Sequence, residues 1–96
     1  MADFLKQPSE EFTIALDFSG DLDTGETLSS AVVTATDSAG TDVTATIVVS
    51  DAVSGDTWAV RVQAGTAGSD YKITVVVTTS TGQVYEHEVM MRVREL

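Results

Sequence analysis

The chain has 96 residues, no cysteine and a formal net charge of −10, from 15 acidic and five basic side chains. This length fits one domain, since domains commonly run to about 100–150 residues. The lack of cysteine excludes disulfides and thiolate zinc sites. Nucleic acid and anionic membrane surfaces are poor partners for so acidic a chain, because binding them needs basic patches. The charge fits either plain solubility or steering toward a basic partner or a cation, and composition leaves both open.

The first ten residues lack the basic and apolar regions of a signal peptide. No stretch approaches the roughly 20 apolar residues of a membrane span. We predict that residues 1–10 form an N-terminal arm, at best an edge strand, because Pro8 has no N–H for a sheet ladder. Phe4 and Leu5 would either cover the chain's own core or insert into a neighbouring subunit. Residues 11–96 are predicted to form the single domain.

Alternating apolar residues predict the first strands. Glu11–Phe18 is the first, followed by a loop over residues 19–26. Thr27–Thr36 is the second, with a bulge near Ser29 and Ser30, because the face that carries the apolar residues switches there. After a turn at residues 37–42, the alternation of Val43–Ser50 predicts a third strand. Residues 51–56 are expected to form a loop.

The strictest alternation in the chain lies in Thr57–Ala64 and Tyr71–Thr78, on either side of a glycine-containing corner at residues 65–70. A short turn at residues 80–82 then leads into the last predicted strand, Gln83–Val93. A helix over Glu86–Leu96 also fits the spacing of the apolar residues. The strand is preferred because the alternation starts at Tyr85, directly after a hairpin turn.

Six to seven short strands with regularly spaced turns predict an all-β fold, an antiparallel β-sandwich. Trp58 and Tyr71 favour the immunoglobulin-like version. A tyrosine that follows a corner and opens the penultimate strand occupies the place of the tyrosine corner of such folds. We therefore expect the Tyr71 hydroxyl to bond to the backbone of the preceding loop and the Trp58 indole to lie in the core.

Acidic residues gather in loops that simple strand alternation would place at one end of the sandwich. This predicts an acidic tip that serves as a candidate protein-interaction site, made of Asp21, Asp23, Glu26, Asp51 and Asp56. An extra short strand within residues 50–56 would instead separate these loops. The spacing of residues 21–26 resembles the start of a calcium loop, but the closing glutamate and flanking helices are missing. We expect a solvated turn and no metal.

The chain carries no recognisable catalytic motif. His87 is the single histidine, no G-x-S-x-G elbow surrounds a serine, and the glycine corner lies between strands with no helix to receive a phosphate. We expect no catalytic residue, no cofactor and no enzymatic activity. Arg92 and Arg94 project from one side of the last strand. They suit contacts with the acidic tip of another copy, or protection of a terminal strand from unwanted pairing.

Several short motifs between Lys6 and Glu95 are similar to those of a known family. They are Lys6-Gln7-Pro8, Asp17-Phe18-Ser19, Gly25-Glu26-Thr27-Leu28, Gly65-Thr66-Ala67-Gly68 with Tyr71, Thr78-Thr79, Gly82 and Val93-Arg94-Glu95. On these residues the chain resembles small virion structural proteins of tailed bacteriophages, some described as fibre–tail adaptor proteins. Members often carry a glycine at the place of Ala64.

The resemblance implies a non-enzymatic virion subunit, made in the host bacterial cytoplasm, that joins a neck or tail ring to fibres in many symmetric copies. Its partners would be other virion proteins of the tail, neck, fibre or capsid. A capsid decoration protein is the alternative within this class. A free-standing immunoglobulin-like module that binds a glycan or a host surface is the alternative of another class.

Overall fold

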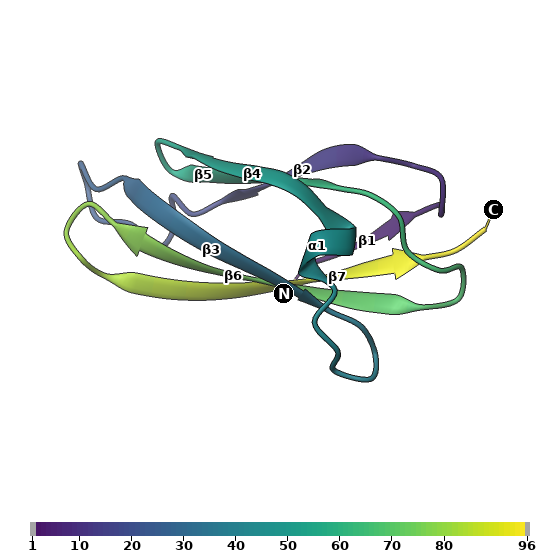
Figure 1. Ribbon diagram of the computed structural model, residues 1–96. Helices are drawn as coiled ribbons and strands as arrows, with labels where there is room; N and C mark the ends of the chain where they lie inside the picture. Colours follow the sequence, from purple (N-terminus) through teal and green to yellow (C-terminus); the bar gives the residue numbers. More distant parts are fainter. Residues whose placement is uncertain (1, 96) are drawn as a thin grey trace.

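The computed structural model describes residues 2–95 and shows two β-sheets packed face to face (Figure 1). The larger sheet has the strand order β1 (Ala2–Lys6), β7 (Val84–Val93), β6 (Asp70–Thr79) and β3 (Leu28–Thr36). The smaller sheet has the order β2 (Phe12–Asp17), β5 (Thr57–Val62) and β4 (Val48–Ser54). A short helix, α1 (Thr44–Ile47), joins β3 to β4. The predicted all-β, immunoglobulin-like sandwich is confirmed.

Strand β1 is an edge strand of the larger sheet and pairs in parallel with β7, from Ala2 opposite Val89 to Lys6 opposite Val93. The other strand pairs are antiparallel. The aromatic ring of Phe4 packs against the core and meets the ring of Phe12 edge-on, with 5.9 Å between the ring centroids. The first part of the arm thus covers the chain's own sandwich.

The irregular pattern predicted in the second strand is confirmed as a shift of register. Strand β3 pairs with β6, and the register shifts between Leu28 and Ser30. Beyond this bulge Ala31, Val33 and Ala35 stand opposite buried residues of β6. Their side chains face the smaller sheet, whereas Val32 projects from the outer face and is 68% exposed.

The predicted strand over Val43–Ser50 is wrong in its first half, where α1 forms instead. The Asp42 carboxylate accepts hydrogen bonds from the backbone N–H and hydroxyl of Thr44, at 2.9 and 2.6 Å. Such local bonds favour a turn over an extended chain. One helical turn also buries Ile47, which explains why alternation misled the prediction. Strand β4 starts at Val48 and includes residues 51–54, which were expected to form a loop.

The core lies between the sheets, and β5 and β6 contribute every second residue to it, as predicted. Trp58 is fully buried, and its indole N–H donates to Oδ2 of Asp51 at 2.9 Å. The Tyr71 hydroxyl accepts a hydrogen bond from the backbone N–H of Thr66 at 2.9 Å. The tyrosine corner is therefore confirmed. Within residues 2–95 there is no helix of the length and apolar character that crossing a membrane requires.

Candidate interaction surfaces

Three connections lie together at one end of the sandwich, on the left in Figure 1. The backbone N–H of Phe18 donates to the carbonyl of Asp56 at 2.8 Å, and that of Leu28 donates to Gly55 at 2.7 Å. The N–H of Ser80 donates to the carbonyl of Thr27 at 2.8 Å. These bonds hold residues 19–26, 55–56 and 80–82 at one end, the arrangement that alternating strands predict. We call these three segments the acidic end.

Three of the predicted interaction residues, Asp21, Asp23 and Asp56, are exposed at the acidic end. Asp21 Oδ2 lies 2.9 Å from His87 Nε2. The imidazole ring of His87 also meets the ring of Phe18 edge-on, with 4.6 Å between ring centroids. These contacts join the loop after β2 to β7. The carboxylates of Asp23 and Asp56 face solvent.

Glu26 also belongs to the acidic end, but its side chain points inward and the residue is only 6% exposed. Its carboxylate accepts hydrogen bonds from the hydroxyl of Thr79 at 2.5 Å, from the hydroxyl of Thr81 and from the N–H of Asp23 at 2.9 Å. These bonds favour the ionised form, so they lower the pKa of Glu26, with the Thr79 bond as the largest cause. Glu26 fastens the loop after β2 to the β6–β7 turn.

Asp51 is not part of the acidic end, because it lies within β4 and accepts the hydrogen bond from Trp58. The calcium-like spacing of residues 21–26 does not gather ligands either, since the Glu26 carboxylate is occupied by threonine hydroxyls and an N–H. Among residues 2–95, no cluster of three or more histidine or acidic side chains is placed to hold a metal ion.

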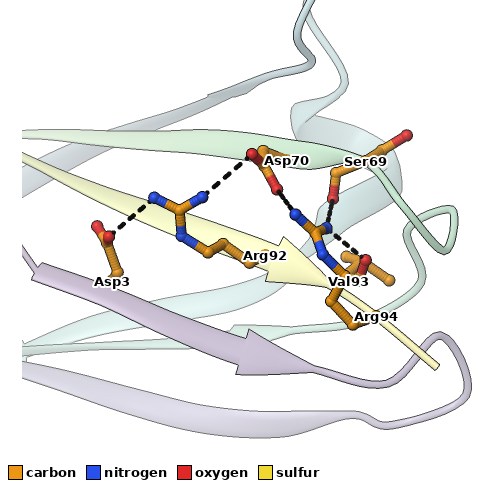
Figure 2. A network of polar contacts seen from close by, with 6 residues as sticks. All are labelled: Asp3, Ser69, Asp70, Arg92, Val93 and Arg94. Atoms are coloured by element: carbon orange, nitrogen blue, oxygen red, sulfur yellow. Dashed lines mark hydrogen bonds and ion pairs between the residues drawn. The ribbon is translucent and has the colours of Figure 1, made fainter. Parts of the chain in front are cut away.

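Arg92 and Arg94 form a polar network near the opposite end of β7 (Figure 2). Arg92 contacts Asp3 at 3.1 Å and Asp70 at 3.3 Å. Arg94 contacts the other oxygen of Asp70 at 3.0 Å, and it donates to the carbonyls of Ser69 and Val93. The network fastens β1 and the start of β6 to β7. The interpretation that these arginines protect a terminal strand from unwanted pairing is wrong. Strand β7 is an inner strand of its sheet, because β1 pairs with its outer side.

Lys6 is a buried charge that the sequence reasoning missed. The residue is 1% exposed, and its ammonium donates to the carbonyls of Gln7 at 2.8 Å, Pro8 at 3.1 Å and Ala64 at 2.5 Å. Burial lowers the pKa of Lys6, an effect that the nearby carboxylate of Glu10 partly offsets. One feature of the sequence does indicate this burial. Lys6 lies two residues after the inward-facing Phe4, so both side chains lie on the same face of β1.

A shallow hollow of about 200 Å³ lies on the outer face of the smaller sheet, lined by Thr13, Ser50, Asp51, Ala52, Ala59 and Arg61. Ligand pockets usually measure about 300–1,000 Å³ and enclose their ligand. The guanidinium of Arg61 is paired with the carboxylate of Glu11 at 2.6 Å. This hollow is therefore smaller than a typical small-molecule site. The candidate sites for contacts with other proteins are the surfaces and edges of the sandwich.

A family model matches most of the chain. No curated protein matches the sequence significantly. A family described as Gp77, podophage GP4 fiber-tail adaptor protein gp77, matches residues 6–92. The match includes β2 to β6 and nearly all of β7, the glycine corner with Tyr71, and the buried Lys6 and Glu26. Since it covers nearly the whole sequence, the chain belongs to the family of the podophage GP4 fiber-tail adaptor protein gp77.

Proposed function

We propose that this chain is a non-enzymatic structural subunit of a tailed-phage virion, where it links the tail to fibres. The observation that carries the proposal is the family match over residues 6–92. Its partners are other virion proteins of the tail, neck or fibre, and it works in several symmetric copies. It is made in the host cytoplasm and resides in the virion. The full burial of Trp58 supports this role over glycan binding, which uses exposed aromatic rings.

We further propose that the acidic end contacts a basic surface of a neighbouring virion protein. Asp23 and Asp56 support this, because both are exposed and neither carboxylate belongs to an ion pair in the described chain. Opposite charges across an interface speed association and set its register. Leu5, 58% exposed on β1, offers an apolar contact near the other end. Arg92 contributes chiefly by holding β1 in place, and Arg94 by holding the start of β6.

Disruption of the gene in its phage tests the adaptor role. We expect assembled tails that lack fibres, seen by electron microscopy, and recovery of the fibres when the chain is supplied from a plasmid. Particles that keep their fibres would contradict the proposal. Particles with normal fibres but fragile capsids would instead identify a decoration protein.

The same complementation tests the acidic end. Asp23→Asn with Asp56→Asn removes two exposed charges from it. The matched control is Glu86→Gln with Glu88→Gln, which removes two charges from the outer face of β7. We expect fewer fibres per particle with the first double variant than with the second. Equal fibre numbers would contradict a role for the acidic end and leave the adaptor role itself untouched.

A further inference from the structure

The free edge of β3 is closed at both ends and open in the middle. The backbone N–H of Leu28 donates to Gly55 at 2.7 Å at one end. At the other end the N–H of Ala35 donates to the Thr44 hydroxyl at 2.9 Å, and the carbonyl of Ala35 accepts from Val43 at 2.8 Å. Backbone groups that point to one side of a strand alternate along it. The groups of Ala31 and Val33 therefore point to the same free side as those of Ala35.

Between these closed ends, Ala31 and Val33 make no hydrogen bond on the free side within residues 2–95. Both side chains are half-buried, so the two residues are held in an extended strand with their backbone groups unpaired. A row of unpaired backbone groups at a sheet edge is a template for another strand. The open stretch of β3 thus presents unpaired backbone groups of the kind to which another strand can bind.

The open stretch, Ser30-Ala31-Val32-Val33-Thr34, is uncharged and nearly symmetric about Val32. Hydroxyl residues stand at both ends, and small apolar residues flank the centre. An antiparallel copy of the same segment would place like beside like, with Val32 against Val32. Cross-strand pairs of hydroxyl residues and of β-branched residues are favourable. The segment is complementary to itself.

We propose that two copies of this chain pair through their β3 strands, antiparallel and with Val32 opposite Val32 of the second copy. Ala31 of each copy then exchanges backbone hydrogen bonds with Val33 of the other, about four bonds in total. Ser30 lies opposite Thr34, and the two larger sheets become one continuous sheet. The pairing is isologous, since both copies use the same surface. It rests on the edge geometry and stands apart from the adaptor role.

The two edge strands of the smaller sheet are associated with charges that oppose the same kind of pairing, and β1, the other edge of the larger sheet, is only five residues long. In β4, Asp51 occupies the centre and would meet Asp51 of the second copy. Strand β2 ends at Asp17 and Glu11 directly precedes it, so pairing about Ile14 would place these two carboxylates opposite each other. Like charges directly opposite each other destabilise strand pairs. These charges leave β3 as the long edge strand without such protection.

The net charge of −10 opposes the approach of two copies, so the pairing depends on salt. The Debye length falls from about 30 Å at 0.01 M salt to about 10 Å at 0.1 M. No charged residue lies in β3 itself, so the repulsion acts at longer range and is screened. We expect single copies at low salt and paired copies at high salt and high protein concentration.

Single cysteines test the register, because the natural chain contains none. Residues opposite each other without hydrogen bonds have Cα atoms about 4.5 Å apart, which a disulfide can bridge. We expect Val32→Cys to form disulfide-linked dimers at least about tenfold faster than Val84→Cys, because pairing raises the effective concentration of the thiols. Val84 is the matched control, being 61% exposed on the outer face of β7 rather than on β3. The ratio of the Val32→Cys rate to the Val84→Cys rate should grow with salt concentration.

Register is checked by a mixture of Ser30→Cys and Thr34→Cys chains. Heterodimers should form faster than either homodimer, because residue 30 lies opposite residue 34. Cross-linking of Val32→Cys at the rate of Val84→Cys, at every salt concentration, would overturn the proposal. That result would indicate that the open edge of β3 pairs with a strand of a different virion protein and not with a second copy. Homodimers of Ser30→Cys that form as fast as the heterodimers would overturn the register.

Discussion

Replacement of Lys6 by methionine tests whether this buried ammonium holds the arm on the sandwich. The methionine keeps most of the aliphatic stem and removes the donor. Three backbone carbonyls, of Gln7, Pro8 and Ala64, then lose their hydrogen bonds in a site that is 1% exposed. The bond to Ala64 is the one that joins residues far apart in the chain, so its loss frees residues 7–10 from the corner after β5.

The expected loss of stability follows from two opposing effects. A hydrogen bond to a charged group contributes about 1.5–3 kcal/mol, and Lys6 makes three. Removing the ammonium also removes the several kcal/mol that its burial costs. We expect a net loss of about 2 kcal/mol. For a domain of this size, that lowers the melting temperature by about 10 °C.

Thermal unfolding followed by circular dichroism measures this loss, with Lys72→Met as the control. Lys72 is an exposed lysine on β6, so the same substitution there removes no buried contact. If the two variants melt at the same temperature, the reasoning about Lys6 is refuted. Hydrogen exchange adds a local readout, because the N–H of Arg94 donates to the carbonyl of Lys6 and should exchange faster in the Lys6 variant.

The pH dependence of the same pair of proteins tests the lowered pKa of Lys6. Because the folded-state pKa lies below the model value of 10.5, the unfolded chain binds more protons between the two values. The stability of the natural protein should therefore rise with pH through that window, relative to Lys6→Met. A gap between the two proteins that stays constant up to pH 10.5 would contradict the effect of burial.

Further predictions concern the acidic end and the glycine corner. Because the folded-state pKa of Glu26 is lowered, its contribution is complete above its unfolded value of 4.5 and is lost as the pH falls through the folded value. Glu26→Gln should therefore flatten acid unfolding, and equal acid curves would contradict the contact with Thr79. Tyr71→Phe should cost about 1 kcal/mol in urea unfolding, since Thr66 loses its partner. Ala64→Gly should raise stability by about 1 kcal/mol, because relief of the φ of +58° returns about 1–3 kcal/mol and the freer unfolded glycine takes back about 0.4–1 kcal/mol. An unchanged melting temperature would argue against backbone strain there.

Alternation predicted most of the strands because their residues are half-buried in a regular way. The patterns of β2, β5, β6 and β7 alternate in burial much as they do in sequence. The same rule failed over Thr44–Ile47, because residues four apart share a face in a helical turn and in a strand alike. The bonds from Asp42 decide between the two, and hydropathy does not record them.

The polar contacts of the candidate surfaces were harder to predict, because they join residues far apart in the chain. Glu26 meets Thr79 across 53 residues, Lys6 meets Ala64 across 58, and Arg92 meets Asp3 across 89. A sequence pattern assigns charged residues to the surface, where most of them lie. It could place Glu26 in an acidic loop, but it could not show that the side chain turns inward to the threonines.

The two buried charges explain how so small a domain can hold its surfaces in a fixed geometry. Glu26 locks the loop after β2 to the β6–β7 turn, and Lys6 locks the arm to the corner after β5. Neither charge is neutralised by the other, since each serves hydroxyl or backbone partners at its own end. Fixing loops before binding reduces the entropy lost when an interface forms. A subunit that acts by linking its neighbours gains from this. Loosening either lock should therefore weaken assembly even though neither side chain is exposed to touch a partner.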